Sequence, residues 1–83
     1  MFHVYVIKNN FGKRYTGQTE DLESRLKRHN GELKSKARSY TKLNSGIWEL
    51  VYQEVYETRE EAVKREKELK SYQGRQFLKK IGI

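Results

Sequence analysis

FHVYVIK at residues 2–8 and KRYTGQ at residues 13–18 decide the fold of this chain. Alternate positions of the first stretch carry Phe, Val and Val, a pattern typical of a half-buried β-strand. The asparagines and the glycine between the two stretches supply turn chemistry. The pattern therefore predicts a hairpin, in which Tyr5 and Tyr15 share one face if the register is centred near Asn10.

A helix is predicted directly after the hairpin. Thr19 is the expected N-cap, acidic residues fill the first turn, and Asn30 with Gly31 forms the stop. Residues 31–46, rich in Ser, Lys, Gly and Asn, are predicted to form a long basic loop. The inner face of the helix is expected to carry Leu22, Leu26 and His29, with Arg25 at its edge.

The remaining sequence predicts one more strand and two helices. IWELVYQEVY at 47–56 is apolar at alternate positions, and Thr58 with Glu61 forms a capping box that opens the next helix. Gly74 is expected to end that helix, and a last short helix is expected at 75–80. The order ββαβαα predicts an α+β fold, with a small three-stranded antiparallel sheet flanked by helices.

Length and composition fit one small folded domain over residues 1–83. Hydrophobic and charged residues each make up 35% of the chain, and there is no cysteine, so packing alone must hold the fold. No apolar run is long enough to cross a bilayer, and the N-terminal residues lack the order of a secretory signal. We therefore expect a cytoplasmic protein that does not act in a membrane.

Positive charge is concentrated in the middle of the chain. The net charge is +7, and the stretch from Arg25 to Lys42 carries seven cations against one acid. A polyanion such as nucleic acid is the natural partner, although a merely solvated basic loop is the alternative. An anionic membrane surface fits less well, because the stretch lacks a bulky apolar face. The candidate contacts to phosphate are Arg28, Lys34, Lys36, Arg38 and Lys42.

Glu66 is an acid in an unexpected place. On a helical wheel it falls in the middle of the apolar stripe formed by Ala62, Val63 and Leu69. A carboxylate there is unfavourable unless a cation, a metal ion or several donors meet it. A salt bridge to an arginine, with Arg25 as the candidate, is the structural alternative to a functional role.

One combination of motifs resembles a known family. His3-Val4-Tyr5 is followed by Tyr15-Thr16-Gly17, then by Arg25 in DLESRLKRHN and by an acid in REKELK. This ordered set resembles the GIY-YIG nuclease superfamily, and most closely its short stand-alone bacterial members. The resemblance spans nearly the whole chain, although His3 stands where the named motif has Gly and Thr16 where it has Ile.

The resemblance implies a metal-dependent endonuclease that hydrolyses a phosphodiester bond by in-line attack of water. Tyr5, Tyr15, Arg25, His29 and Glu66 match its catalytic residues, and Glu66 would bind one Mg²⁺ or Mn²⁺ ion. Tyr5 is the expected general base or water orienter. His29 is the competing base, because an ordinary histidine pKa near 6.5 suits that task better than the phenol value near 10.

The implied partner is nucleic acid, with DNA favoured over RNA. Any sequence specificity is expected to come from the shape of the nucleic acid or from a protein partner, because so small a domain has little surface for reading bases and phosphate contacts carry no sequence information. A role in DNA repair or recombination follows from the same resemblance. Two other hypotheses are a nucleic-acid-binding module with weak or absent catalysis, and a structural protein with an ion pair between Glu66 and Arg25.

Overall fold

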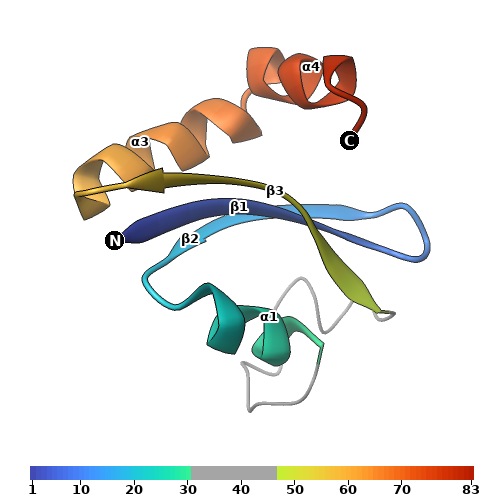
Figure 1. Cartoon of the computed structure of the whole chain (residues 1–83). Helices are drawn as coiled ribbons and strands as arrows, with labels where there is room; N and C mark the ends of the chain where they lie inside the picture. Colours follow the sequence, from blue (N-terminus) through green and yellow to red (C-terminus); the bar gives the residue numbers. More distant parts are fainter. Residues whose placement is uncertain (31–46) are drawn as a thin grey trace.

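The computed structural model describes residues 1–30 and 47–83, which form one antiparallel sheet with helices on both faces (Figure 1). None of the helices in this part of the chain is long and apolar enough to span a bilayer. The order confirms the predicted α+β fold with the arrangement ββαβαα. The elements are β1 (Phe2–Asn9), β2 (Arg14–Thr19), α1 (Leu22–His29), β3 (Trp48–Tyr56), α3 (Arg59–Lys70) and α4 (Tyr72–Lys80).

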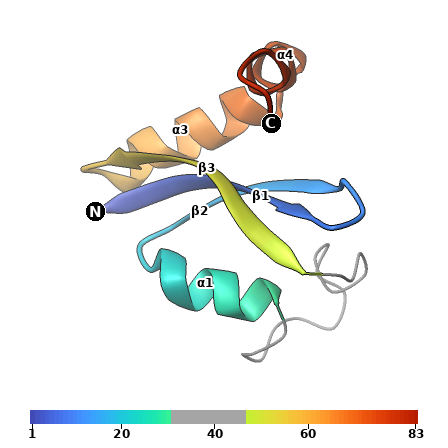
Figure 2. The ribbon, with the colours of Figure 1, turned by 45° about the vertical axis from the view of Figure 1, so that its right-hand side comes forward.

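Strand β1 is the centre of the sheet, whose order is β2-β1-β3. Helices α3 and α4 lie on one face of the sheet and α1 lies on the other (Figures 1 and 2). Residues 4–7 of β1 are therefore all buried, and the strand is not the half-buried one that its alternation predicted. A central strand covered on both faces must bury both sets of its side chains.

Two apolar clusters hold the layers together, one on each face of the sheet. The cluster under α3 and α4 contains Val4, Val6, Ala62, Leu69 and Leu78. The cluster under α1 contains Tyr5, Ile7 and Trp48, with Leu22 and Leu26 packed against it. The α1 cluster is the smaller of the two and is built around aromatic side chains that also carry polar groups.

A bulge in β3 redirects its side chains from one face to the other. Val6 pairs with Tyr52 and Ile7 pairs with Leu50, so Val51 is an extra residue on β3. Leu50, before the bulge, packs in the α1 cluster, whereas Tyr52, after it, packs against the α3 cluster. The uninterrupted alternation of the sequence predicted a single inner face, which is wrong because an inserted residue shifts the pleat by one position.

The predicted N-cap of α1 is also wrong. Thr19 is the last residue of β2, and the cap is Asp21, whose Oδ1 accepts a hydrogen bond of 3.1 Å from the Ser24 amide. The Thr19 hydroxyl instead accepts a hydrogen bond of 3.1 Å from the amide of Asp21. The capping role predicted for Thr58 is confirmed, because its Oγ1 accepts a hydrogen bond of 3.2 Å from the Glu61 amide.

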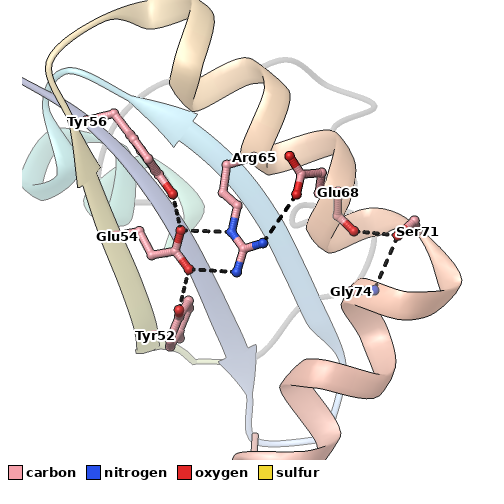
Figure 3. Close-up of polar contacts among 7 residues, drawn as sticks. All are labelled: Tyr52, Glu54, Tyr56, Arg65, Glu68, Ser71 and Gly74. Carbon is pink, nitrogen blue, oxygen red and sulfur yellow. Dashed lines mark hydrogen bonds and ion pairs between the residues drawn. The ribbon is translucent and has the colours of Figure 1, made fainter.

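Gly74 does not end a helix, as the sequence had suggested, but lies in the first turn of α4. Ser71 makes the break, as the C-cap of α3 and the N-cap of α4, and its hydroxyl accepts a hydrogen bond of 3.2 Å from the Gly74 amide (Figure 3). A Cβ atom at Gly74 would lie 2.1 Å from the Glu68 carbonyl oxygen. The glycine is required because two helices meet backbone to backbone at this corner.

A network of charges and phenols, which the sequence did not reveal, ties α3 to β3. Arg65 donates two hydrogen bonds to the Glu54 carboxylate, from Nε at 2.9 Å and from Nη2 at 3.0 Å (Figure 3). The hydroxyls of Tyr52 and Tyr56 donate to the same carboxylate. Burial acts to raise the pKa of Glu54, but the hydrogen bonds from Arg65 and the two tyrosines outweigh it, and the pKa is lowered.

We expect Glu54→Gln to lower the free energy of unfolding at neutral pH by about 2 kcal/mol, because it removes the less exposed of the two carboxylates that pair with Arg65 and leaves only Glu68, at 3.4 Å. The Glu54 and Arg65 side chains are only 18% and 27% exposed, so solvent does little to replace the pair. Urea denaturation followed by circular dichroism measures the change. Glu49→Gln, at an exposed position of the same strand, is the control and is expected to have little effect.

The same network predicts a pH dependence of stability. The pKa of Glu54 is lower in the folded than in the unfolded state, where it is about 4.3, so the unfolded state binds protons first. The stabilisation is therefore complete above about pH 4.3 and is lost as the pH falls through the lowered folded-state pKa. The stability difference between the wild type and Glu54→Gln should shrink on acidification, and a constant difference would contradict this assignment.

Candidate active site

Tyr5 and His29 form the centre of a polar cluster beneath α1. The side chain of Tyr5, from the central strand, is 1% exposed, and its hydroxyl oxygen lies 2.8 Å from Nε2 of His29 at the end of α1. Tyr15 on β2 completes the cluster. Its ring centroid lies 4.9 Å from that of His29 and 6.3 Å from that of Tyr5. Three of the predicted site residues, far apart in sequence, are thus in contact.

The hairpin register explains how the two tyrosines meet. Tyr5 pairs with Gly17 and Ile7 pairs with Tyr15, so the centre of the hairpin lies one residue beyond the expected Asn10, and the tyrosines still share a face. A Cβ atom at Gly17 would lie 2.7 Å from the Tyr5 hydroxyl oxygen and 3.1 Å from Cε1 of Tyr15. The absence of a side chain at Gly17 therefore provides the space in which the Tyr5 hydroxyl lies.

The surroundings of Tyr5 keep its hydroxyl protonated. Burial raises the pKa of Tyr5 above its ordinary value, and the neighbouring Tyr15 and Glu66 raise it further, while the charge of Arg25 opposes the shift. An isolated phenolate is therefore disfavoured at neutral pH. Glu66 contributes to the shift although its helix, α3, lies on the other face of the sheet from α1 (Figure 1).

His29 is neutral in the same cluster. Burial, together with the positive charges of Arg25 and Arg28, lowers the pKa of His29 to about 4. The imidazole does not keep the ordinary value near 6.5 on which its choice as a base rested. In the tautomer that carries its proton on Nδ1, the neutral ring accepts a hydrogen bond from the Tyr5 hydroxyl at Nε2. The pair is then a neutral donor and a neutral acceptor, able to pass a proton along one hydrogen bond.

Arg25 and Arg28 border a polar hollow at the start of α1. This hollow, of about 430 Å³, is lined by both of these residues, by Arg59 from α3 and by acidic residues at positions 20 and 21. Arg59 is engaged there, with Nη2 at 3.4 Å from Oε1 of Glu20. Arg25 is partly buried and is close enough to lower the pKa values of both Tyr5 and His29. A guanidinium beside the tyrosine cluster is in a position to receive an anion.

Glu66 does not pair with Arg25, the arginine partner that the sequence suggested. Its carboxylate accepts a hydrogen bond of 2.9 Å from Nζ of Lys70, one turn along α3. The Glu66 side chain is 21% exposed, so it lies at the border of the core rather than in it. Lys70 Nζ is also 6.0 Å from the centre of the Tyr15 ring, which brings this acid and cation beside the tyrosine cluster.

The donor set around Glu66 fits a magnesium ion better than a metal that needs many protein ligands. No group of three or more His, Cys, Asp or Glu able to hold a metal occurs within residues 1–30 and 47–83. Mg²⁺ commonly uses one or two carboxylates and completes its shell with water and substrate phosphates. A single accessible carboxylate beside cationic and phenolic groups meets that requirement. It also implies weak binding of the metal when no phosphate is present.

The structure thus places Tyr5, Tyr15 and His29 in direct contact, with Arg25 and Glu66 in electrostatic range of Tyr5. Arg28 lies on the same side, in electrostatic range of both Tyr5 and His29. The other predicted phosphate contacts lie outside the residues that the structure describes; they are Lys34, Lys36, Arg38 and Lys42.

Sequence reasoning gave no role to two residues of the site, Gly17 and Lys70. A glycine inside a strand is a known sign of close approach by another group, and here that group is the Tyr5 hydroxyl. A lysine four residues after an acid on a helix is a known pairing pattern, which would have pointed to Lys70 as the partner of Glu66. Both signals were present in the sequence and depend on which element each residue occupies.

Comparison with known proteins agrees with this geometry. The family model of the GIY-YIG catalytic domain matches residues 1–80, so the chain belongs to the GIY-YIG family of nucleases. Two similar proteins are a UPF0213 protein of Staphylococcus epidermidis, 46% identical, and one of Staphylococcus aureus, 41% identical. Each alignment runs over 78 residues and covers 94% of this chain and 90% of the relative.

The fold is also similar to that of a solved relative. The solution NMR structure of a UPF0213 protein of Bacillus halodurans matches with a TM-score of 0.55 and 28% identity, over 99% of this chain and 86% of that one. Together the matches confirm the resemblance to the short stand-alone type of GIY-YIG protein. A nuclease domain implies a nucleic-acid substrate, and the UPF0213 names state no specific function.

Proposed function

We propose that this protein is a metal-dependent endonuclease that hydrolyses phosphodiester bonds in DNA by in-line attack of water. The observation that carries the proposal is the hydrogen bond between Tyr5 and His29, formed beside Tyr15 and within electrostatic range of Arg25 and Glu66. Hydrolysis of a phosphodiester needs an oriented water, neutralisation of charge on the phosphoryl oxygens and help for the leaving oxygen. Groups suited to each task lie around this cluster.

Tyr5 and His29 act together on the attacking water. The Tyr5 hydroxyl donates its proton to Nε2 of His29, which leaves the phenol oxygen able to accept a hydrogen bond from water. When the water attacks phosphorus, its proton moves to the Tyr5 oxygen and the Tyr5 proton moves to His29. A free phenolate is not formed in this relay, so the raised pKa of Tyr5 does not prevent it. The lowered pKa of His29 makes the imidazole a weak proton acceptor and limits the contribution of the relay to the rate.

Arg25 and Tyr15 bind the phosphate. The planar guanidinium of Arg25 matches two phosphoryl oxygens and neutralises charge that grows during the attack. The Tyr15 hydroxyl would donate to a phosphate oxygen or hold the water beside Tyr5. Arg28, exposed in the last turn of the same helix, would contact a neighbouring phosphate, as would the four basic residues of segment 31–46 that were named from the sequence.

Glu66 would hold the single divalent ion, Mg²⁺ or Mn²⁺, once its carboxylate is no longer paired with Lys70. When bound, such an ion supplies Lewis-acid stabilisation of the phosphoryl charge and lowers the pKa of its water. Lys70 neutralises the carboxylate until then, and a substrate phosphate is a competing acceptor for its ammonium group. Metal and substrate would therefore bind cooperatively. A role in DNA repair or recombination, with a protein partner that supplies specificity, extends this proposal.

Nicking of supercoiled plasmid tests the proposal directly. We expect the purified chain to convert supercoiled to open-circular DNA in Mg²⁺ or Mn²⁺, and EDTA to stop the reaction because the ion supplies part of the transition-state stabilisation. Restoration of activity by excess metal controls for irreversible damage by the chelator. Binding without any metal-dependent cleavage would contradict the nuclease. It would support the alternative of a binding module, which the engagement of Glu66 by Lys70 favours.

The Tyr5–His29 pair makes a separate prediction. Tyr5→Phe should raise the pKa of His29 above about 4, because the hydroxyl that stabilises the neutral imidazole is lost. Titration of the imidazole proton signals by NMR measures the shift, and Tyr56→Phe, on the far face of the sheet, is the control. Cleavage should fall by about 10²- to 10⁴-fold in the same variant. An unchanged pKa of His29 would show that the two side chains are not coupled.

A further inference from the structure

A second cationic surface lies beside the proposed site, on the other side of the edge strand β2. It is a groove of about 510 Å³ between the start of β2 and the helices α3 and α4. Its bottom is apolar, because Leu69 and Leu78, which line it, are 1% and 2% exposed. The groove is not part of the stretch that the sequence marked as basic. It is assembled from three separate elements.

Among the residues that the structure describes, four cations line this groove and no acid does. Two come from the hairpin, Lys13 and Arg14, and two from the helices, Lys70 and Arg75. Lys13 and Arg75 are exposed, and no ion pair to either occurs in the part of the chain that the structure describes. Arg14 is anchored by a hydrogen bond of 3.0 Å from Nη1 to the main-chain oxygen of Ile83, so its guanidinium is held at the groove.

The groove is continuous with the tyrosine cluster. Tyr15 lines it, and Lys70 both lines it and pairs with Glu66 at 2.9 Å. A polyanionic chain that placed one phosphate at Arg25 and Glu66 would therefore meet further cations along β2. An elongated surface of single sign, beginning at a proposed scissile site, matches the regular charge spacing of a nucleic-acid backbone.

We propose that this groove binds the sugar–phosphate backbone of the substrate strand next to the scissile phosphate. The inference rests on the proposed function, because it takes the bound strand to be the one that is cut. Lys13 and Arg75 would contact phosphates at the rim, and Lys70 would move from Glu66 to a phosphate as the strand enters. The bound strand is taken to be DNA, as in the proposed function.

The test compares two double variants that remove the same charge. Lys13→Gln with Arg75→Gln neutralises the groove, and Lys64→Gln with Lys80→Gln neutralises two exposed lysines that do not line it. Fluorescence anisotropy with a labelled single-stranded DNA oligonucleotide in EDTA measures affinity without cleavage. Thermal melts establish that both proteins are folded. None of the four side chains is buried, so neither double variant should unfold the protein.

We expect the groove variant to bind DNA at least about tenfold more weakly than the control variant, as expected for the loss of two contacts to charged groups. The negative slope of log affinity against log salt should become shallower by about 1.4 relative to the wild type, which is about 0.7 for each lost phosphate contact. Equal losses of affinity in the two double variants would contradict the proposal that the groove binds DNA.

Failure of the groove and failure of the nuclease are distinguishable. If the wild type nicks plasmid but the two double variants bind alike, the strand runs elsewhere and the proposed function stands. If the groove variant alone loses affinity but the wild type never cleaves, the groove is supported as a DNA-binding surface and the proposed nuclease activity is contradicted. The two results come from separate assays, because binding is measured without metal and cleavage with it.

Discussion

Glu66→Gln should reduce metal-dependent nicking of plasmid DNA by about 10³-fold or more. The substitution keeps the shape of the side chain but removes the charge that would hold the divalent ion, and the ion contributes several kcal/mol to transition-state stabilisation. Affinity for DNA in EDTA should not weaken, because the residue lost is an acid in a site for a polyanion. The expected result is therefore a protein that binds and does not cut.

The stability of this variant should hardly change. Glu66 and Lys70 form an i,i+4 pair on α3 with side chains that are 21% and 50% exposed, and i,i+4 pairs on helices contribute only about 0.3–0.5 kcal/mol. Glu60→Gln, an exposed acid in the first turn of the same helix, is the matched control and should cut like the wild type. Undiminished cleavage by Glu66→Gln would remove the metal assignment. A decrease of several kcal/mol in the free energy of unfolding would mean that Glu66 has a structural role instead.

Gly74→Ala should lower the free energy of unfolding by about 3 kcal/mol. Helix propensity alone predicts the opposite sign, because alanine is favoured over glycine inside a helix by about 1 kcal/mol. The added Cβ atom, however, would lie 2.1 Å from the Glu68 carbonyl oxygen and 2.4 Å from Cα of Leu69. Both are backbone atoms that cannot rotate away, so α4 would have to shift from the end of α3. Urea denaturation measures the change.

Gly82→Ala provides the comparison for this variant. Gly82 has a φ of +89°, and no atom lies within 4 Å of an added Cβ, so only conformational strain of about 1 kcal/mol is expected. Gly74→Ala should therefore be the more destabilising of the two, although its position is helical. If Gly74→Ala were instead neutral or stabilising, the close packing of α3 and α4 at Ser71 would be wrong.

Much of the fold could be predicted from the sequence, because its signals are local. The alternation of residues 2–8, the turn residues after them and the capping box at Thr58 each act within a few residues, and the predicted element order is confirmed. One error is local, since the N-cap of α1 is Asp21 and not Thr19. Others occur where distant parts meet. The bulge at Val51 is visible only in the pairing of β3 with β1, and Gly74 is required by a neighbouring helix rather than by its own.

The candidate site shows the same division. Strand periodicity predicts that Tyr5 and Tyr15 share one face of the sheet. Their contact with His29 could not be predicted in this way, because it depends on how α1 packs against that face. The partner of Glu66 was misjudged, because the helical wheel gives the face of a residue but not which of several cations will reach it. Lys70, one turn away, is held there by the helix itself, whereas Arg25 must be supplied by another element.

By itself, the sequence determined the order of the strands and helices and the excess of positive charge, and its motifs resembled those of a GIY-YIG site. The order and the charge follow from periodicity and composition, which are read along the chain, whereas the candidate site residues follow from the resemblance. Only the tertiary structure decided that burial keeps Tyr5 protonated and His29 neutral, that Gly17 leaves room for their hydrogen bond, and that β2 carries a second cationic groove. Burial and long-range contacts depend on which elements meet in space, and residue order alone does not specify those distances.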